Sequence, residues 1–156
     1  MRQISFLISE IHDGKTVKSF LYENGVSGRL LIKLKQTELG ITLDGRHIRV
    51  IDRLTAGKTL NINIPHDECP AAVSDFTVPV LYFDNDVIAL DKPPFLVVHP
   101  SRSHQGNTLA NAFACILQQK GMSAAFRPIN RLDRDTSGIV ISALNPFSAS
   151  GLSGNM

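Results

Sequence analysis

Reactive side chains are concentrated in residues 130–138, a segment with two carboxylates, two guanidinium groups and two hydroxyl groups. Asp133 lies between Arg131 and Arg134. A nearby guanidinium can lower a carboxyl pKa by about 1–3 units, and a carboxylate kept ionised can act as a nucleophile or a base. Asp133 is therefore a candidate catalytic residue. A capped turn, in which Asp and Thr side chains bond the local backbone, explains the same composition, and spacing alone slightly favours that structural role.

Strands and helices are expected on both sides of this segment. Three short apolar runs predict strands, the first two joined as a hairpin by an Asp-Asn-Asp turn. They are residues 80–83, 87–90 and 139–141. A helix is predicted between a cap at Asn107 or Thr108 and a stop at Gly121, because apolar side chains recur there at helical spacing. Asn145 and Pro146 are typical of the cap and first position of a further helix.

The amino-terminal part of the chain predicts a second, smaller group of elements. Two helices are expected over residues 16–24 and 28–39, with Ser27 as the N-cap of the second. An alternating segment at 41–43, an Asp-Gly turn and a return arm through 48–50 predict a hairpin. A further alternating strand and a linker containing three prolines follow, at residues 59–64 and 65–79.

Composition excludes several classes of protein. The chain has 156 residues, 43% of them hydrophobic and 19% charged, which is typical of a folded domain rather than a disordered chain. No apolar run approaches the roughly 18 residues that a membrane-spanning helix needs, and the amino end lacks a signal-peptide core. We therefore expect a cytoplasmic protein. Cys69 and Cys115 belong to no Cys/His cluster, which argues against a zinc ribbon and against a disulfide framework.

Positive charge is unevenly distributed along the chain. Residues 1–66 carry a net charge of +4 and residues 67–156 a net charge of −2, giving +2 overall. The densest group of cations is Arg29, Lys33, Lys35, Arg46, Arg49, Arg53 and Lys58. Clustered Lys and Arg side chains contact phosphates in nucleic-acid-binding proteins, so this region could bind a polyanion. On charge alone, an ordinary solvated surface explains it equally well.

The motif at residues 131–140 closely resembles the catalytic motif of the RluA-type RNA pseudouridine synthases. Three further segments resemble that family in the expected order, namely residues 81–93, 96–100 and 106–112. Ahead of them, the two helices and the hairpin over residues 17–64 resemble an S4-like RNA-binding domain. Together these resemblances cover the chain from Val17 to about Pro146.

The resemblance implies an α+β fold in three parts. An S4-like domain is expected at 14–64, a linker at 65–79, and the amino-terminal part of a mainly antiparallel-sheet pseudouridine synthase catalytic domain at 80–156. Family members continue further, with a tyrosine that packs on the target base and a later basic residue. Tyr22 and Tyr82 both lie upstream of the motif, so neither matches that tyrosine. We therefore expect that the sequence is an amino-terminal portion of a longer enzyme.

The resemblance also implies a reaction and a set of site residues. The family isomerises uridine to pseudouridine in structured RNA, here ribosomal or transfer RNA, without a metal ion or organic cofactor. Asp133 matches the catalytic aspartate, and Arg131 matches the arginine that helps to fill the space left by the flipped nucleotide. The remaining cations expected to contact RNA are Arg134, Arg29, Lys33 and Lys35. The residues expected to support the loop are Lys92, Pro93, Thr136, Ser137 and Gly138. His99 is expected to be a packed histidine rather than an acid or base.

Two positions depart from the family pattern, and two other functions remain open. Asn130 stands where the family often has His, and Phe95 stands where a Gly commonly follows the Lys-Pro motif. One alternative to the synthase function is an inactive RNA-binding module. A weaker alternative makes Asp133 and Asp135 a metal-binding pair of a nucleotide-sugar enzyme, although the flanking arginines would compete with the cation. The sequence leaves open which RNA and uridine are used, and the oligomeric state.

Overall fold

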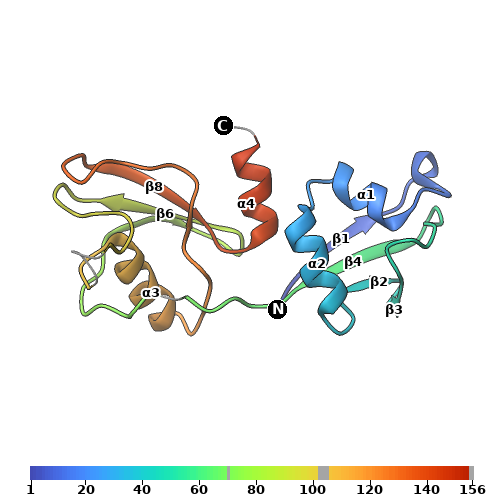
Figure 1. The fold of residues 1–156 in the computed structure, drawn as a ribbon, viewed down its shortest axis with the longest axis horizontal. Helices are drawn as coiled ribbons and strands as arrows, with labels where there is room; N and C mark the ends of the chain where they lie inside the picture. The colour runs from blue at the N-terminus through green and yellow to red at the C-terminus, as the bar shows by residue number, and fades with distance from the viewer. Residues whose placement is uncertain (70, 102–105, 155–156) are drawn as a thin grey trace. The chain divides into compact units, whose positions relative to one another are not determined.

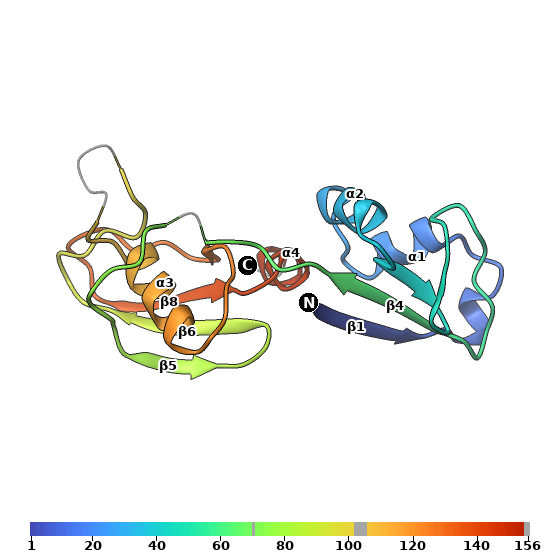
Figure 2. The ribbon, with the colours of Figure 1, turned by 90° about the horizontal axis from the view of Figure 1, so that it is seen from below.

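The computed structural model describes residues 1–69, 71–101 and 106–154. The chain divides into two compact units, Met1–Pro65 and His66–Met156. In each unit, helices pack on an antiparallel sheet (Figures 1 and 2). The predicted α+β class is confirmed for the described residues. Within those residues, no helix is long and apolar enough to cross a membrane.

The first unit is a four-stranded sheet with helices on one face (Figure 2). Its strands run in the order β1-β4-β2-β3. The elements are β1 (Arg2–Leu7), a short 3-10 helix (Glu10–His12), α1 (Val17–Glu23), α2 (Gly28–Gln36), β2 (Ile41–Leu43), β3 (Arg46–His47) and β4 (Thr59–Ile64). The sequence analysis did not predict β1, although Ile4 and Phe6 alternate with polar residues there. This strand pairs with β4 along its whole length, from Arg2 opposite Ile64 to Leu7 opposite Thr59.

Local side chains determine where α1 and α2 begin and end. The side-chain oxygens of Thr16 and Ser27 accept hydrogen bonds from the backbone of the first turns, so each residue is an N-cap. The predicted N-cap of α2 is therefore confirmed. The helix ends at Gln36, earlier than predicted, because the chain turns back towards β2. Gly40 lies in that turn, where an added Cβ would clash with the Leu34 carbonyl oxygen.

The return arm of the first predicted hairpin is shorter than expected. Only Arg46–His47 pairs with β2 in the sheet. The following residues leave the sheet because their carbonyl groups bond α1 instead. The Val50 oxygen accepts from the Lys18 N–H at 2.9 Å, and the Asp52 oxygen accepts from the Val17 N–H at 3.0 Å.

The second unit is also a four-stranded antiparallel sheet, in the order β5-β6-β8-β7. Its elements are β5 (Val80–Phe83), β6 (Val87–Lys92), α3 (Leu109–Gln119), β7 (Arg127–Pro128), β8 (Gly138–Ala143) and α4 (Pro146–Ser153). The strands and helices predicted in this region are confirmed, including the caps at Thr108 and Asn145. Helix α3 packs against β6 and β8, and Phe113, Leu90 and Val140 are fully buried between them. The core of the unit therefore lies directly beneath β6 and β8.

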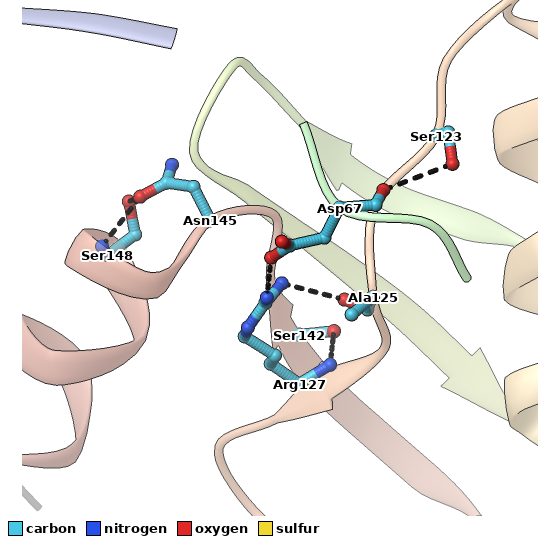
Figure 3. Close-up of polar contacts among 7 residues, drawn as sticks. All are labelled: Asp67, Ser123, Ala125, Arg127, Ser142, Asn145 and Ser148. Atoms are coloured by element: carbon cyan, nitrogen blue, oxygen red, sulfur yellow. Dashed lines mark hydrogen bonds and ion pairs between the residues drawn. The ribbon is translucent and has the colours of Figure 1, made fainter. Parts of the chain in front are cut away.

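The chain between the units packs against the second one. Val78 is buried in its core, and the Ala72 carbonyl oxygen accepts from the Asn111 side chain at 2.7 Å. Asp67 forms an ion pair with Arg127, which Figure 3 shows beside β7. The predicted linker was residues 65–79, whereas residues 66–79 belong to the second compact unit along with the sheet.

Candidate active site

The segment 130–138 is the loop that joins β7 to β8, and Asn130 fixes its beginning. The Asn130 side-chain NH₂ donates to the Ile139 carbonyl oxygen at 2.8 Å, and its side-chain oxygen accepts from the Ile141 N–H at 2.9 Å. One side chain thus satisfies two backbone groups on β8. The sequence analysis treated Asn130 only as a departure from the family pattern, because nothing in the local sequence indicates this contact.

Within the loop, two features shape the backbone around Asp133. The Thr136 N–H donates to the Asp133 carbonyl oxygen at 3.2 Å and closes a turn. Gly138 has a φ of +140°, which favours glycine, and an added Cβ would touch the partly buried Leu132 side chain at 3.4 Å. Leu132 packs towards the core, whereas Asp133 is exposed. A carboxylate so placed is accessible to a macromolecular substrate.

Lys92, the last residue of β6, holds the opposite side of the loop. Its side chain has no exposed surface. The ammonium group donates to the carbonyl oxygens of Pro93 at 3.0 Å, Leu96 at 2.8 Å and Arg134 at 3.0 Å. A buried charge requires such partners, since it has lost its water. Lys92 therefore ties the loop that carries Asp133 to the turn that follows β6.

The carboxylates of Asp133 and Asp135 interact electrostatically with this ammonium group. Burial lowers the pKa of Lys92 from its ordinary value, and the negative charges of Asp135 and Asp133 partly oppose the shift. The guanidinium of Arg134 lies 3.9 Å from Asp135, in an exposed ion pair. The loop thus carries exposed charged side chains, and the buried ammonium group of Lys92 bonds its backbone.

His99 packs on one aromatic ring and interacts electrostatically with Arg131. Its ring centroid is 5.4 Å from that of Phe126, which is in turn 5.0 Å from the ring of Phe113. Partial desolvation lowers the pKa of His99, and the positive charge of Arg131 adds to this effect. His99 therefore rests against one aromatic ring while the residue stays exposed, and its expected role as a packed histidine stays a prediction.

The turn held by Lys92 has an unusual residue at its tip. Phe95 has a φ of +66°, in the left-handed region, and 71% of its surface is exposed. The left-handed conformation costs a residue with a side chain about 1–2 kcal/mol. Pro94 and Phe95 are the central residues of a turn, and a positive φ at the third position is the feature of a type II turn that normally requires glycine or asparagine.

The remaining predicted residues fall into two groups. Pro93, Thr136, Ser137 and Gly138 lie at or beside the Lys92-tethered loop in the second unit, with Pro93 contributing its carbonyl oxygen. Arg29, Lys33 and Lys35 lie on α2 in the first unit, where Arg29 and Lys35 are exposed and Lys33 is half-buried. Among the described residues, no group of three or more His, Cys, Asp or Glu side chains could hold a metal ion.

Most of the second unit resembles a known protein family. Residues 86–156 match the family described as RNA pseudouridylate synthase. The second unit therefore contains an RNA pseudouridine synthase-like domain. The matched residues of this synthase-like domain include Lys92 and the whole loop 130–138. The match begins after the first unit, so the S4-like assignment is still a prediction.

Individual proteins similar to this chain are also named pseudouridine synthases. The Bacillus subtilis protein named uncharacterized RNA pseudouridine synthase YjbO is 34% identical over 140 residues, which are 88% of this chain and 50% of the relative. The ribosomal large subunit pseudouridine synthase D of Xanthomonas campestris is 36% identical over 104 residues, covering 65% of this chain and 31% of the relative. The B. subtilis protein YlyB, also named an RNA pseudouridine synthase, is 27% identical over 97% of this chain and 52% of its own length. The chain thus spans about half the length of these relatives, or less.

Proposed function

We propose that this protein is an RNA pseudouridine synthase in which Asp133 is the catalytic carboxylate. The observation that carries the proposal is an exposed aspartate on a loop fixed from both sides, by Asn130 and by Lys92, inside the segment that matches the synthase family. Isomerisation of uridine breaks the bond from ribose to base nitrogen and forms one to base carbon, with a proton moved from that carbon to nitrogen. It is redox-neutral, and a carboxylate can serve it as nucleophile or base.

The residues around Asp133 suit a base that has left the RNA stack. Unstacking a nucleotide costs a few kcal/mol, which contacts in the vacated space must offset. Arg131 and Arg134 are exposed on the same loop and carry the charge and planar group for such contacts. We assign Arg131 to the vacated space and Arg134 to the RNA backbone, with Lys92, Pro93, Thr136, Ser137 and Gly138 in support of the loop.

We propose ribosomal RNA as the substrate, with transfer RNA as the alternative. Support comes from the relatives named for the large ribosomal subunit. A ribosomal substrate also agrees with the expected cytoplasmic location. We further propose that residues 14–64 form an S4-like RNA-binding domain, in which Arg29, Lys33 and Lys35 on α2 contact phosphates.

The test is an isomerisation assay on the complete gene product, comparing the parent with Asp133→Asn. Loss of acid–base catalysis alone lowers a rate by about 10²–10⁴-fold, and we expect at least that loss. Asp135→Asn is the matched control, because it removes an equally exposed carboxylate from the same loop. Equal activity of parent and Asp133→Asn would remove Asp133 from the chemistry, and absence of isomerisation in the parent would overturn the function.

A second candidate is RNA binding without catalysis, favoured by the excess positive charge in the first unit. Binding through phosphates is salt-dependent, with log affinity falling by about 0.7 per contact for each tenfold rise in salt on single strands. Salt-sensitive binding by this chain together with no isomerisation would support the second candidate. Binding that does not respond to salt would exclude it.

A further inference from the structure

We propose that Phe95 is a stacking platform for an unpaired RNA nucleobase beside the loop that carries Asp133. The inference deepens the proposed function, on which it rests, because it assigns an RNA contact to a residue outside the motif of residues 131–140. It begins from two unfavourable features of one residue. Phe95 has a positive φ, and 71% of its surface is exposed.

Neither feature is explained by folding. A type II turn needs positive φ at this position, which glycine supplies without strain. The exposed ring gains little from burial, so packing does not compensate for the strained backbone. Strained residues that persist without a structural benefit cluster at ligand-binding and active sites. A single exposed apolar side chain would need no explanation, but one held in a strained turn does.

The location of the turn connects Phe95 to the candidate active site. Carbonyl oxygens on both sides of Phe95, those of Pro93 and Leu96, accept hydrogen bonds from the Lys92 ammonium group. The same ammonium group bonds the Arg134 carbonyl oxygen, one residue after Asp133. The turn that carries Phe95 and the loop that carries Asp133 are therefore held together through one buried ammonium group.

The chemistry of this surface fits RNA. Nucleobases stack on exposed aromatic side chains irrespective of base identity, because every base has a π face. Arg134 on the neighbouring loop, which we assign to the RNA backbone, supplies positive charge for a phosphate of the same nucleotide strand. An aromatic ring beside exposed guanidinium groups is the combination that single-stranded nucleic acid requires.

The test measures binding of a fluorescein-labelled single-stranded uridine oligonucleotide by the full chain. Loss of one stacking contact weakens binding by about 5- to 150-fold, and we expect Phe95→Gly to do so. Because glycine relieves the turn, the unfolding midpoint of Phe95→Gly should be unchanged or higher. Phe95→Tyr keeps the ring and should bind like the parent. An oligonucleotide containing 2-aminopurine should show fluorescence quenching with the parent and with Phe95→Tyr but not with Phe95→Gly.

The matched control is Tyr82→Leu. Tyr82 is another exposed aromatic residue, but it lies on β5, at the edge of the sheet of the second unit. This substitution should leave RNA affinity unchanged. The inference is overturned if the parent does not bind the oligonucleotide, if Phe95→Gly binds as tightly as the parent, or if Tyr82→Leu weakens binding equally. None of these measurements needs turnover, so they are independent of the isomerisation assay that tests the proposed function.

Discussion

The ammonium group of Lys92 donates to the Arg134 carbonyl oxygen at 3.0 Å, although 42 residues separate the two in the chain. This hydrogen bond joins the end of β6 to the loop that carries Asp133. The same group also bonds Pro93 and Leu96, so one buried cation fixes both the loop and the turn beside it. The position of the candidate carboxylate therefore depends on a residue outside its own motif.

Replacing Lys92 by Met tests this dependence. The substitution keeps an apolar side chain of similar length but leaves three carbonyl oxygens without their donor. Each unpaired buried acceptor costs about 1–3 kcal/mol, while removal of the buried charge and access of water to the exposed residues Pro93 and Arg134 offset part of the sum. We therefore expect the free energy of unfolding to fall by at least about 1 kcal/mol in denaturant titrations. Isomerisation should fall as well, because the loop loses its attachment. Lys58→Met, at an exposed cation of the first unit, should stay within about 0.5 kcal/mol of the parent. A Lys92→Met protein as stable and active as the parent would contradict the assignment.

His99 gives the site a pH dependence with a defined sign. Its pKa in the folded protein is lowered, by desolvation first and by Arg131 second, so the unfolded chain takes up this proton more readily. The stability contributed by neutral His99 is present above the ordinary pKa near 6.5 and is lost as pH falls through the folded-state value. The difference in unfolding free energy between the parent and His99→Gln should follow this course.

Arg131→Met should raise the pKa of His99, measured by NMR titration of its ring protons. The value should remain below the ordinary one, because desolvation is the larger cause and is unaffected by the substitution. An unchanged pKa in Arg131→Met would show that the two side chains do not interact.

Elements determined by local pattern were predictable from the sequence. The strand β4 and the start of α3 at Thr108 match the predictions, because alternation, a helical stripe and a capping side chain all lie within the segment itself. Strand β1 was not predicted, since it forms by pairing with β4 near the other end of the unit. The shortened hairpin has a similar cause, because its return arm bonds α1.

The candidate site was only partly predictable for the same reason. The motif at residues 131–140 predicted the loop and the candidate aspartate, because the whole motif lies within one short segment of the chain. The contacts that hold the loop, from Lys92 and from Asn130, join residues that are distant or on a neighbouring strand. A fully buried lysine contradicts the ordinary preference of that residue for water, so composition could not reveal it. The positive φ of Phe95 likewise becomes visible only in three dimensions.

Asn130→Ala tests the other attachment of the loop. The substitution removes a donor to the Ile139 carbonyl oxygen and an acceptor for the Ile141 N–H. Each net hydrogen bond contributes about 0.5–1.5 kcal/mol, so we expect the free energy of unfolding to fall by about 1–3 kcal/mol in denaturant titrations. Amide exchange at Ile141 should become faster, which NMR would detect. Unaltered exchange would show that water replaces the side chain without loss.

Breaking the ion pair between Asp67 and Arg127 tests whether the segment that precedes β5 contributes to the stability of the second unit. The two side chains are only 19% and 22% exposed, and Arg127 also donates to the Ala125 carbonyl oxygen at 3.2 Å (Figure 3). Exposed ion pairs contribute about 0–1 kcal/mol, whereas breaking a fully buried one costs about 3–5 kcal/mol. Asp67→Ala should therefore lower the unfolding free energy by an intermediate amount, about 1–2 kcal/mol. Asp135→Ala is the control, since its pair with Arg134 spans 3.9 Å with side chains 74% and 58% exposed. It should change stability by less than about 0.5 kcal/mol. Equal effects of the two substitutions would mean that Asp67 contributes no more than a surface charge.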